Sequence, residues 1–147
     1  MTIDAIARTD VVTVDIEATL TEISHVMRDE GVGCVVVVDG KETVAGLLTD
    51  RDLVVSGLAE GRHPDQCIAN DILSTNVFSV APTDSVASVA RQMREQGVRR
   101  VVVMEDHELV GIVTLDDLLV HLTDELDCLV SVVEGEFPEE KPHRTTV

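Results

Sequence analysis

The pattern of apolar and polar positions along the chain occurs twice. Two stretches carry apolar residues every three to four positions, which is the spacing of an amphipathic helix with one buried face. These apolar positions are Leu20, Ile23 and Met27 in the first stretch and Val86, Val89 and Met93 in the second. Each stretch is followed by an unbroken apolar run, Cys34–Val38 and Val101–Met104. A run without alternation predicts a strand that is buried on both faces.

The two copies of the pattern form an internal repeat. A shift of 66 residues (27 + 66 = 93) aligns Met27 with Met93 and also aligns the two unbroken apolar runs. After a polar turn in each copy the shift becomes 65 residues (46 + 65 = 111), which aligns Gly46 with Gly111. One deletion in a turn explains the change, and chance does not keep such a register over two whole segments.

Each repeat predicts the element order β-α-β-β-α. Short extended segments at Val11–Val14 and Val77–Val80 precede the two amphipathic helices. Polar turns after the apolar runs lead to second strands at Val44–Thr49 and Leu109–Thr114, so that the middle strands form hairpins. A helix begins directly after each second strand, and the last one is predicted from Asp116 to about Val133.

Residues with known preferences for helix ends flank the amphipathic helices. Thr19 and Asp84 stand where N-caps belong, and Glu22 follows Thr19 by three residues, as in a capping box. Gly31 and Gly97 follow the last helical positions, where a glycine in the left-handed conformation commonly ends a helix.

The repeats set the predicted domain organisation. We expect a first repeat at residues 1–60, a linker at 61–67, a second repeat with an extended last helix at 68–134, and a flexible tail at 135–147. The stretch from 57 to 66 has the most loop-like composition of the chain.

The charge balance is strongly acidic. The 147 residues include 11 Lys and Arg against 28 Asp and Glu, a formal net charge of −17, and the only lysines are Lys41 and Lys141. Nucleic-acid affinity depends on cations at phosphates and on aromatic stacking, and both are scarce here, so we expect no nucleic-acid binding. An acidic, lysine-poor surface is also typical of a salt-adapted cytosol, such as that of a halophilic archaeon, where salt screens the self-repulsion. A surface that binds a partner is the alternative.

Nothing in the sequence predicts membrane insertion, secretion or a metal site. The N-terminus lacks the basic and apolar regions of a signal peptide, and no run reaches the roughly 18 apolar residues of a membrane span. The cysteines Cys34, Cys67 and Cys128 are widely spaced, without a CxxC or a Cys/His pair at zinc spacing. We expect a cytoplasmic protein without a metal, with Cys34 and Cys128 buried in apolar runs.

Two segments resemble the signature of a known family. Gly46-Leu-Leu-Thr-Asp-Arg-Asp52 and Gly111-Ile-Val-Thr-Leu-Asp-Asp117 are similar to the G-h-h-[ST]-x-x-D signature of CBS (cystathionine-β-synthase) domains, where h is apolar. The preceding strand–turn–strand segments resemble that family's hairpin. Because the likeness covers nearly everything from Ile6 to about Leu122 and occurs twice in register, the chain is identified as a stand-alone tandem pair of CBS domains.

The resemblance implies a fold and a function. The fold is α/β (α+β), with two β-α-β-β-α repeats packed sheet to sheet as a pseudo-twofold pair and two clefts between them. Many members of the family bind AMP, ADP or ATP in such clefts, and the pairs commonly dimerise. We therefore expect a homodimeric regulatory module that binds an adenine nucleotide and acts in trans on a protein partner.

Other functions remain open from the sequence. One alternative is a structural or dimerisation module without a nucleotide, which would use the long final helix. Another is a sensor of ligands of the S-adenosylmethionine type. No nucleophile or base is arranged near the motifs, so we expect no catalysis.

The repeated motif suits a nucleotide but also has a structural explanation. Asp52 or Asp117 can accept hydrogen bonds from the cis-diol of a ribose, and Thr49 or Thr114 can donate a hydroxyl to ribose or phosphate. The adjacent helix N-terminus favours anions. The same Thr-x-x-Asp spacing also forms a capping box that requires no ligand. The spacing alone favours the cap, and the duplicated family context favours the ligand.

Further site candidates come from the resemblance and from the scarcity of cations. The resemblance implies cleft-lining residues at Thr13 and Ser79, backbone contacts to the adenine edge at Gly33-Cys34 and Arg99-Arg100, and apolar packing on the base at Val14 and Val80. Arg51, Arg99 and Arg100 are candidates for binding phosphate, with pairing to a neighbouring carboxylate as the alternative. Because the two repeats differ at these positions, we expect the two clefts to differ in affinity or one of them to be empty.

Overall fold

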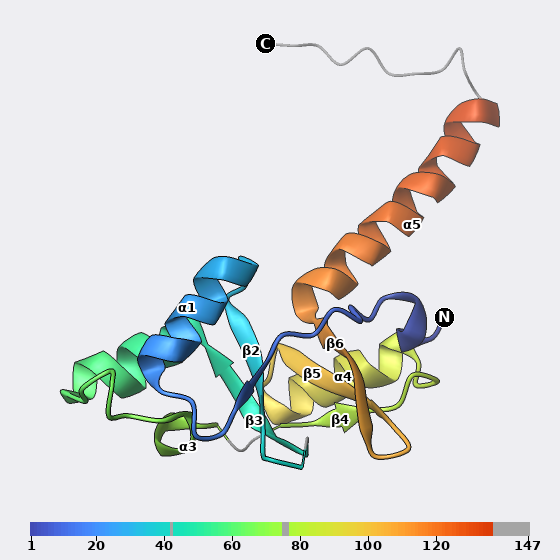
Figure 1. The fold of residues 1–147 in the computed structure, drawn as a ribbon. Coiled ribbons are helices and arrows are strands. Elements are labelled where there is room, and N and C mark those ends of the chain that lie inside the picture. Colours follow the sequence, from blue (N-terminus) through green and yellow to red (C-terminus); the bar gives the residue numbers. More distant parts are fainter. Residues whose placement is uncertain (42, 75–76, 137–147) are drawn as a thin grey trace, which may run out of the picture.

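Two three-stranded sheets form the centre of the molecule in the computed structural model, which describes residues 1–41, 43–74 and 77–136 (Figure 1). The first sheet has the order β1-β2-β3 and the second the order β4-β5-β6. In each sheet the first strand runs parallel to the second, and the second runs antiparallel to the third. The strands are β1 Thr13–Asp15, β2 Cys34–Val38, β3 Val44–Thr49, β4 Ser79–Val80, β5 Arg100–Glu105 and β6 Glu108–Thr114. The predicted α+β fold of two equivalent repeats is therefore confirmed.

The amphipathic helix of the first repeat, α1 (Leu20–Glu30), has the predicted ends. The Thr19 hydroxyl accepts a hydrogen bond from the Glu22 N–H at 3.2 Å, and the Glu22 carboxylate accepts one from the Thr19 N–H at 3.3 Å. Gly31 ends the helix in the left-handed conformation at φ 66°. Both the capping box and the C-terminal glycine are confirmed.

The N-cap predicted for the second repeat is wrong. Helix α4 (Val86–Gln96) is capped by Ser85, whose hydroxyl accepts the N–H of Ser88 at 3.1 Å. The Asp84 carboxylate instead accepts the N–H of Ala81 at 2.9 Å and so stabilises the turn before the helix. Gly97 ends α4 in the left-handed conformation, as predicted.

The leading segment of each repeat packs into the core of the other repeat. The turn η1 (Ile3–Ala5) places Ile3 in the core formed by the second sheet and α4. The short helix α3 (Ala69–Ile72) places its apolar residues in the core formed by the first sheet and α1. In Figure 1 the N-terminal segment accordingly crosses from β1 to the side of α4. The two repeats are interlocked by this exchange.

The motif glycines make room for these crossing segments. A Cβ on Gly46 would lie 2.5 Å from the backbone oxygen of Ser74, and a Cβ on Gly111 would lie 2.9 Å from that of Arg8. Because no side-chain atom fits at these distances, glycine is required where the leading segment of one repeat meets the third strand of the other.

The inner faces of the two sheets meet between the repeats. Val36 and Val102 are almost fully buried, yet they belong to neither of the two cores. Since neighbouring strand residues point to opposite faces, these two side chains point away from the helices and towards the other repeat. The sheet-to-sheet packing of the pair is therefore confirmed.

Some element boundaries differ from the prediction. Strands β1 and β4 begin two residues later than predicted, at Thr13 and Ser79. After α2 (Asp50–Asp52) the chain continues as the π-helical turn η2 (Leu53–Gly57) and the 3₁₀ turn η3 (Leu58–Glu60). Part of the stretch predicted as a loop at 57–66 is therefore helical.

The final helix, α5 (Leu115–Glu136), is longer than predicted and projects from the body of the molecule (Figure 1). Within the predicted tail, 137–147 lie outside the described residues. Cys128 is exposed on α5 and Cys34 is only half-buried, so the expectation that both lie in the core is wrong. Among the helices of the described residues, none combines the length and apolar character that a membrane crossing needs.

Candidate ligand cleft

Both Thr-x-x-Asp motifs form capping boxes. In the first repeat the Thr49 N–H donates to Asp52 Oδ2 at 2.8 Å, and the Asp52 N–H donates to Thr49 Oγ1 at 3.2 Å. In the second repeat the corresponding bonds join Thr114 and Asp117 at 3.3 and 3.1 Å. The structural explanation of the motif is thus realised in both repeats, and any ligand contact would be additional to it.

Arg8 is a functional candidate that the sequence reasoning missed. Its Nε and Nη2 atoms donate to Asp117 Oδ1 at 3.0 and 2.8 Å, which leaves Oδ2 for the capping bond. The Asp117 side chain is 11% exposed and that of Arg8 67%. A shift of 66 residues aligns Arg8 with Ser74, so the ion pair is peculiar to one repeat. The signal in the sequence was an arginine, in a chain with few cations, at a position where the other repeat has a serine.

A cleft of about 310 Å³ lies between the repeats beside this ion pair. It contains Arg8 together with Arg100 and Thr114 of the second repeat and the Gly33-Cys34 segment of the first. We call it the arginine cleft, and its lining residues are Arg8, Asp10, Val11, Val12, Gly31, Val32, Gly33, Cys34, Val36, Arg100, Ile112, Thr114 and Asp116. The structure therefore brings four of the predicted site residues together.

The Gly33-Cys34 segment forms an uncharged part of the arginine cleft, whereas Arg8 and Asp10 are the charged lining residues from the first repeat. Burial raises the pKa of the Cys34 thiol; Arg100 lowers it by a smaller amount, and Asp52 and Asp50 raise it. The Asp50 N–H donates to the Gly33 carbonyl at 3.0 Å. Cys34 therefore presents an uncharged, polarizable thiol to the cleft rather than a thiolate.

The second-repeat side of the arginine cleft carries charges of both signs, because Arg100 and Asp116 both line it. An adjoining hollow of about 300 Å³ is lined by Arg99 and Arg100 beside the first turn of α5. The Arg99 guanidinium lies 3.9 Å from the Asp116 carboxylate, and both side chains are exposed. Arg51 is exposed and lies outside the arginine cleft. Of the three predicted phosphate-binding arginines, Arg100 is the one in the cleft and Arg99 borders it.

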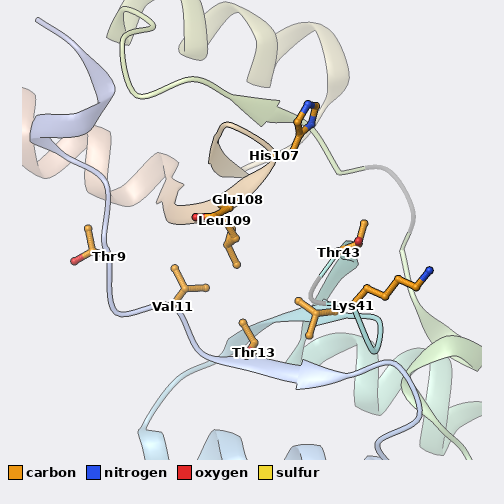
Figure 2. Close-up of a pocket in the computed structure, with 9 residues that line it drawn as sticks. Thr9, Val11, Thr13, Lys41, Thr43, His107, Glu108 and Leu109 are labelled. Atoms are coloured by element: carbon orange, nitrogen blue, oxygen red, sulfur yellow. The ribbon is translucent and has the colours of Figure 1, made fainter.

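A second and larger cleft, of about 500 Å³, lies between the tips of the two hairpins (Figure 2). Figure 2 shows Thr13 and Thr43 on one side and His107 on the other, with Lys41 at the edge. Ser79 lines the corresponding cleft of the other repeat, of about 460 Å³. Thr13 and Ser79 therefore line clefts between the repeats, but not the one that contains the arginines.

Val14 and Val80 require a correction. Their side chains are 7% and 4% exposed and fill the two cores, so they do not point towards a ligand. Both follow a cleft-facing hydroxyl residue, and successive strand side chains point to opposite faces. The accessible apolar lining of the arginine cleft includes instead the half-buried Val12 and Ile112.

Comparison with known families identifies the repeats. The model of the CBS domain matches residues 3–57 and 69–124, which are the two repeats with their leading segments. The chain belongs to the CBS domain family. CBS domain proteins are generally regulatory ligand-binding modules, and this chain contains the domain twice.

Relatives of this CBS pair come from archaea and bacteria. The chain is 38% identical over 120 residues to an uncharacterized protein of Methanopyrus kandleri, a match that covers 81% of this chain and 61% of the relative. It is 36% identical over 106 residues to hypoxic response protein 1 of Mycobacterium tuberculosis, which covers 72% of this chain and 74% of the relative.

Solved structures share the fold of this CBS pair. The crystal structure of hypoxic response protein I with two coordinated zinc ions has a TM-score of 0.73 and 33% identity, covering 82% of this chain and 98% of that one. The hexameric CBS-CP12 protein from bloom-forming cyanobacteria also has a TM-score of 0.73, with 25% identity and a coverage of 81% and 66%. In the described part of this chain, no group of three or more His, Cys, Asp or Glu is placed to hold a metal.

Proposed function

We propose that this CBS pair is a regulatory module that binds an adenine nucleotide in the arginine cleft and acts in trans on a protein partner. The observation that carries the proposal is that Arg8 and Arg100, two of the chain's few cations, line one cleft, although the carboxylates of Asp10 and Asp116 line it as well. A guanidinium in a cleft can bind a phosphate through two parallel hydrogen bonds, which a carboxylate beside it does not replace. The volume of about 310 Å³ lies at the lower end of the roughly 300–1,000 Å³ of small-molecule sites.

The lining of the cleft fits the parts of a nucleotide. Val12, Ile112 and the neutral thiol of Cys34, all half-buried, offer an apolar surface for the base, and the Gly33 backbone also lines the cleft. Arg100 and the Thr114 hydroxyl offer donors to the phosphates at the N-terminus of α5. Since aromatic residues are lacking here, the base is held by aliphatic packing and backbone hydrogen bonds.

Arg8 connects ligand binding to the N-terminal segment of the protein. Arg8 lines the arginine cleft, whereas its partner Asp117 does not, so a phosphate in the cleft competes with Asp117 Oδ1 for the Arg8 guanidinium. Arg8 belongs to the leading segment that packs into the second core through Ile3. Ligand binding therefore acts on the segment that interlocks the repeats. Through this segment the effect of binding is transmitted to the outer surface of the protein.

Two alternatives are separated from this function by experiment. A module without a ligand is favoured by one observation, since the hydrogen bonds of both capping boxes are made between protein atoms alone. A ligand of the S-adenosylmethionine type would use the base subsite but would not need Arg100. The homodimer, the cytoplasmic location and the salt-adapted origin remain predictions from the sequence.

The test is thermal unfolding and calorimetric titration in molar KCl with AMP, ADP, ATP and S-adenosylmethionine. A ligand at a hundred times its dissociation constant adds about 2.7 kcal/mol of stability. At roughly 2–4 °C per kcal/mol, the midpoint for a chain of this size rises by several degrees. We expect this rise with at least one adenine nucleotide.

Matched arginine variants locate the bound nucleotide. Arg100→Gln is expected to weaken binding about tenfold or more, because it removes a charge-assisted hydrogen bond. Arg91→Gln removes the same charge from the exposed face of α4, outside the cleft, and is expected to leave the affinity unchanged. Equal affinity in both variants refutes the arginine cleft as the site. No shift with any adenine compound refutes the function and favours the ligand-free module.

A further inference from the structure

The projecting part of α5 exposes a row of large apolar side chains. Leu119, Leu122, Leu126, Leu129 and Val133 are 47–65% exposed, whereas the apolar faces of α1 and α4 are buried in the two cores. The helix leaves the body near its N-terminal end, and most of its length extends into open space in Figure 1. At 1.5 Å per residue, its 22 residues span about 33 Å. A soluble chain does not leave such a face uncovered without a partner.

The spacing of these side chains is that of a coiled coil. The seam consists of Leu119, Leu122, Leu126, Leu129 and Val133, whereas Leu115, four residues before Leu119, packs against the second core. Consecutive members are three, four, three and four residues apart, so leucine or valine occupies every a and d position of the projecting part of the helix. A period of 3.5 residues keeps this row of side chains facing a second long helix along the whole seam. A helix that packs against a globular core has a broader face with a period of 3.6.

The residues beside the seam favour a helix of the same sequence. The flanking e and g positions between Leu122 and Val133 are Thr123, Glu125, Val130 and Val132, so only one carries a charge. The other acidic residues of this segment, Asp124, Asp127 and Glu134, occupy the outward b and f positions. A basic partner helix would require acidic flanks, and these are almost absent. In the described part of the chain, α5 is also the only long helix whose seam is free to pair.

We propose that a second copy of this chain covers the seam, so that two α5 helices form a coiled coil outside the body of the CBS pair. The interface uses none of the lining of the arginine cleft, and the proposal therefore stands independently of the nucleotide. Because each copy carries a net charge of −17, salt that screens the repulsion between copies strengthens the pairing.

The test is the molar mass by sedimentation equilibrium under reducing conditions, which prevent a disulfide at the exposed Cys128. The wild type is expected at twice the 15.9 kDa of one chain, with a dissociation constant that falls as KCl rises. The double variant Leu122→Gln/Leu129→Gln keeps helix-forming residues but removes four seam leucines per dimer. Its dissociation constant is expected to rise on the order of a hundredfold or more, which gives the mass of one chain.

The control changes the same helix away from the seam. In Val120→Gln/Cys128→Gln both substitutions lie at exposed b and c positions, and the dimer is expected to persist. If the seam variant unfolds, Leu126→Asn changes one a position and is expected to raise the dissociation constant about tenfold. A wild type that stays at 15.9 kDa at high concentration overturns the proposal, and so does a seam variant that dimerises like the control. Either result leaves the thermal shift with adenine nucleotides unaffected.

Discussion

Removing the carboxylate of Asp117 separates the structural role of the Thr-x-x-Asp motif from its proposed ligand role. In Asp117→Ala the Thr114 N–H loses its acceptor and Arg8 loses its ion-pair partner. In the matched variant Asp52→Ala the Thr49 N–H loses the equivalent acceptor. Both variants remove one negative charge from a chain at −17, so the general relief of repulsion is common to them.

The magnitudes follow from these contacts. The lost capping bond and its interaction with the helix dipole cost about 1 kcal/mol in either variant. Since Arg8 is 67% exposed, its ion pair with Asp117 adds only about 0.5–1 kcal/mol, and less in concentrated salt. Asp117→Ala is therefore expected to unfold a few degrees below Asp52→Ala at low salt, at roughly 2–4 °C per kcal/mol.

The assay is thermal and urea unfolding of the ligand-free protein. Arg8→Ala and the double variant Arg8→Ala/Asp117→Ala are measured as well, which completes a double-mutant cycle. The coupling energy between positions 8 and 117 is expected at about 0.5–1 kcal/mol and to fall as KCl rises. A coupling of zero at low salt would refute the ion pair as a stabilising contact. An Asp117→Ala protein as stable as the wild type would show that the capping box contributes nothing, and the motif would then be explained by a ligand alone.

Three further predictions follow from the packing, the cysteines and the charge. Gly111→Ala places a Cβ 2.9 Å from the Arg8 backbone oxygen and is expected to cost about 1–3 kcal/mol in urea unfolding, whereas Gly40→Ala, with open space around its Cβ, is near neutral. Because burial raises the pKa of Cys34, we expect iodoacetamide to modify exposed Cys128 first, and a bound adenine nucleotide to slow the reaction at Cys34 further. Peptide mass spectrometry measures the two modification rates, and equal rates would contradict the burial of Cys34. The melting midpoint is expected to rise as KCl is raised to molar concentrations, and a constant or falling midpoint would exclude screening of self-repulsion as a main contribution to stability.

Local patterns predicted the elements because the physics of each is local. The spacing of Leu20, Ile23 and Met27 predicted α1, and the unbroken run Cys34–Val38 matches β2 residue for residue. The capping box at Thr19 depends on atoms three residues apart, so the sequence contains all of it. The N-cap of α4 could also be predicted from the sequence, because a shift of 66 residues aligns the N-cap Thr19 with Ser85.

Contacts between distant segments could not be predicted in this way. Ile3 lies in the second core. The periodicity of the first repeat does not indicate that the leading segment of this repeat packs against the sheet of the other repeat. The ion pair of Arg8 with Asp117 joins positions 109 residues apart and follows from that exchange. Val14 was expected to face a ligand, but the face of a short strand is fixed by its register, and Thr13 takes the cleft side.

The interlocking also explains why the two repeats need not respond equally to a ligand. Arg8 meets Asp117 because its segment crosses Gly111, whereas Ser74 crosses the equivalent Gly46 without a guanidinium. A ligand that binds Asp117 therefore has to exchange an ion pair, and a ligand that binds Asp52 displaces no ion pair among the described residues. Under the proposed function, the second repeat couples binding to the N-terminal segment through this exchange. The near symmetry of the fold supplies two related motifs, and under the proposed function a single arginine, Arg8, makes the second one responsive to the ligand.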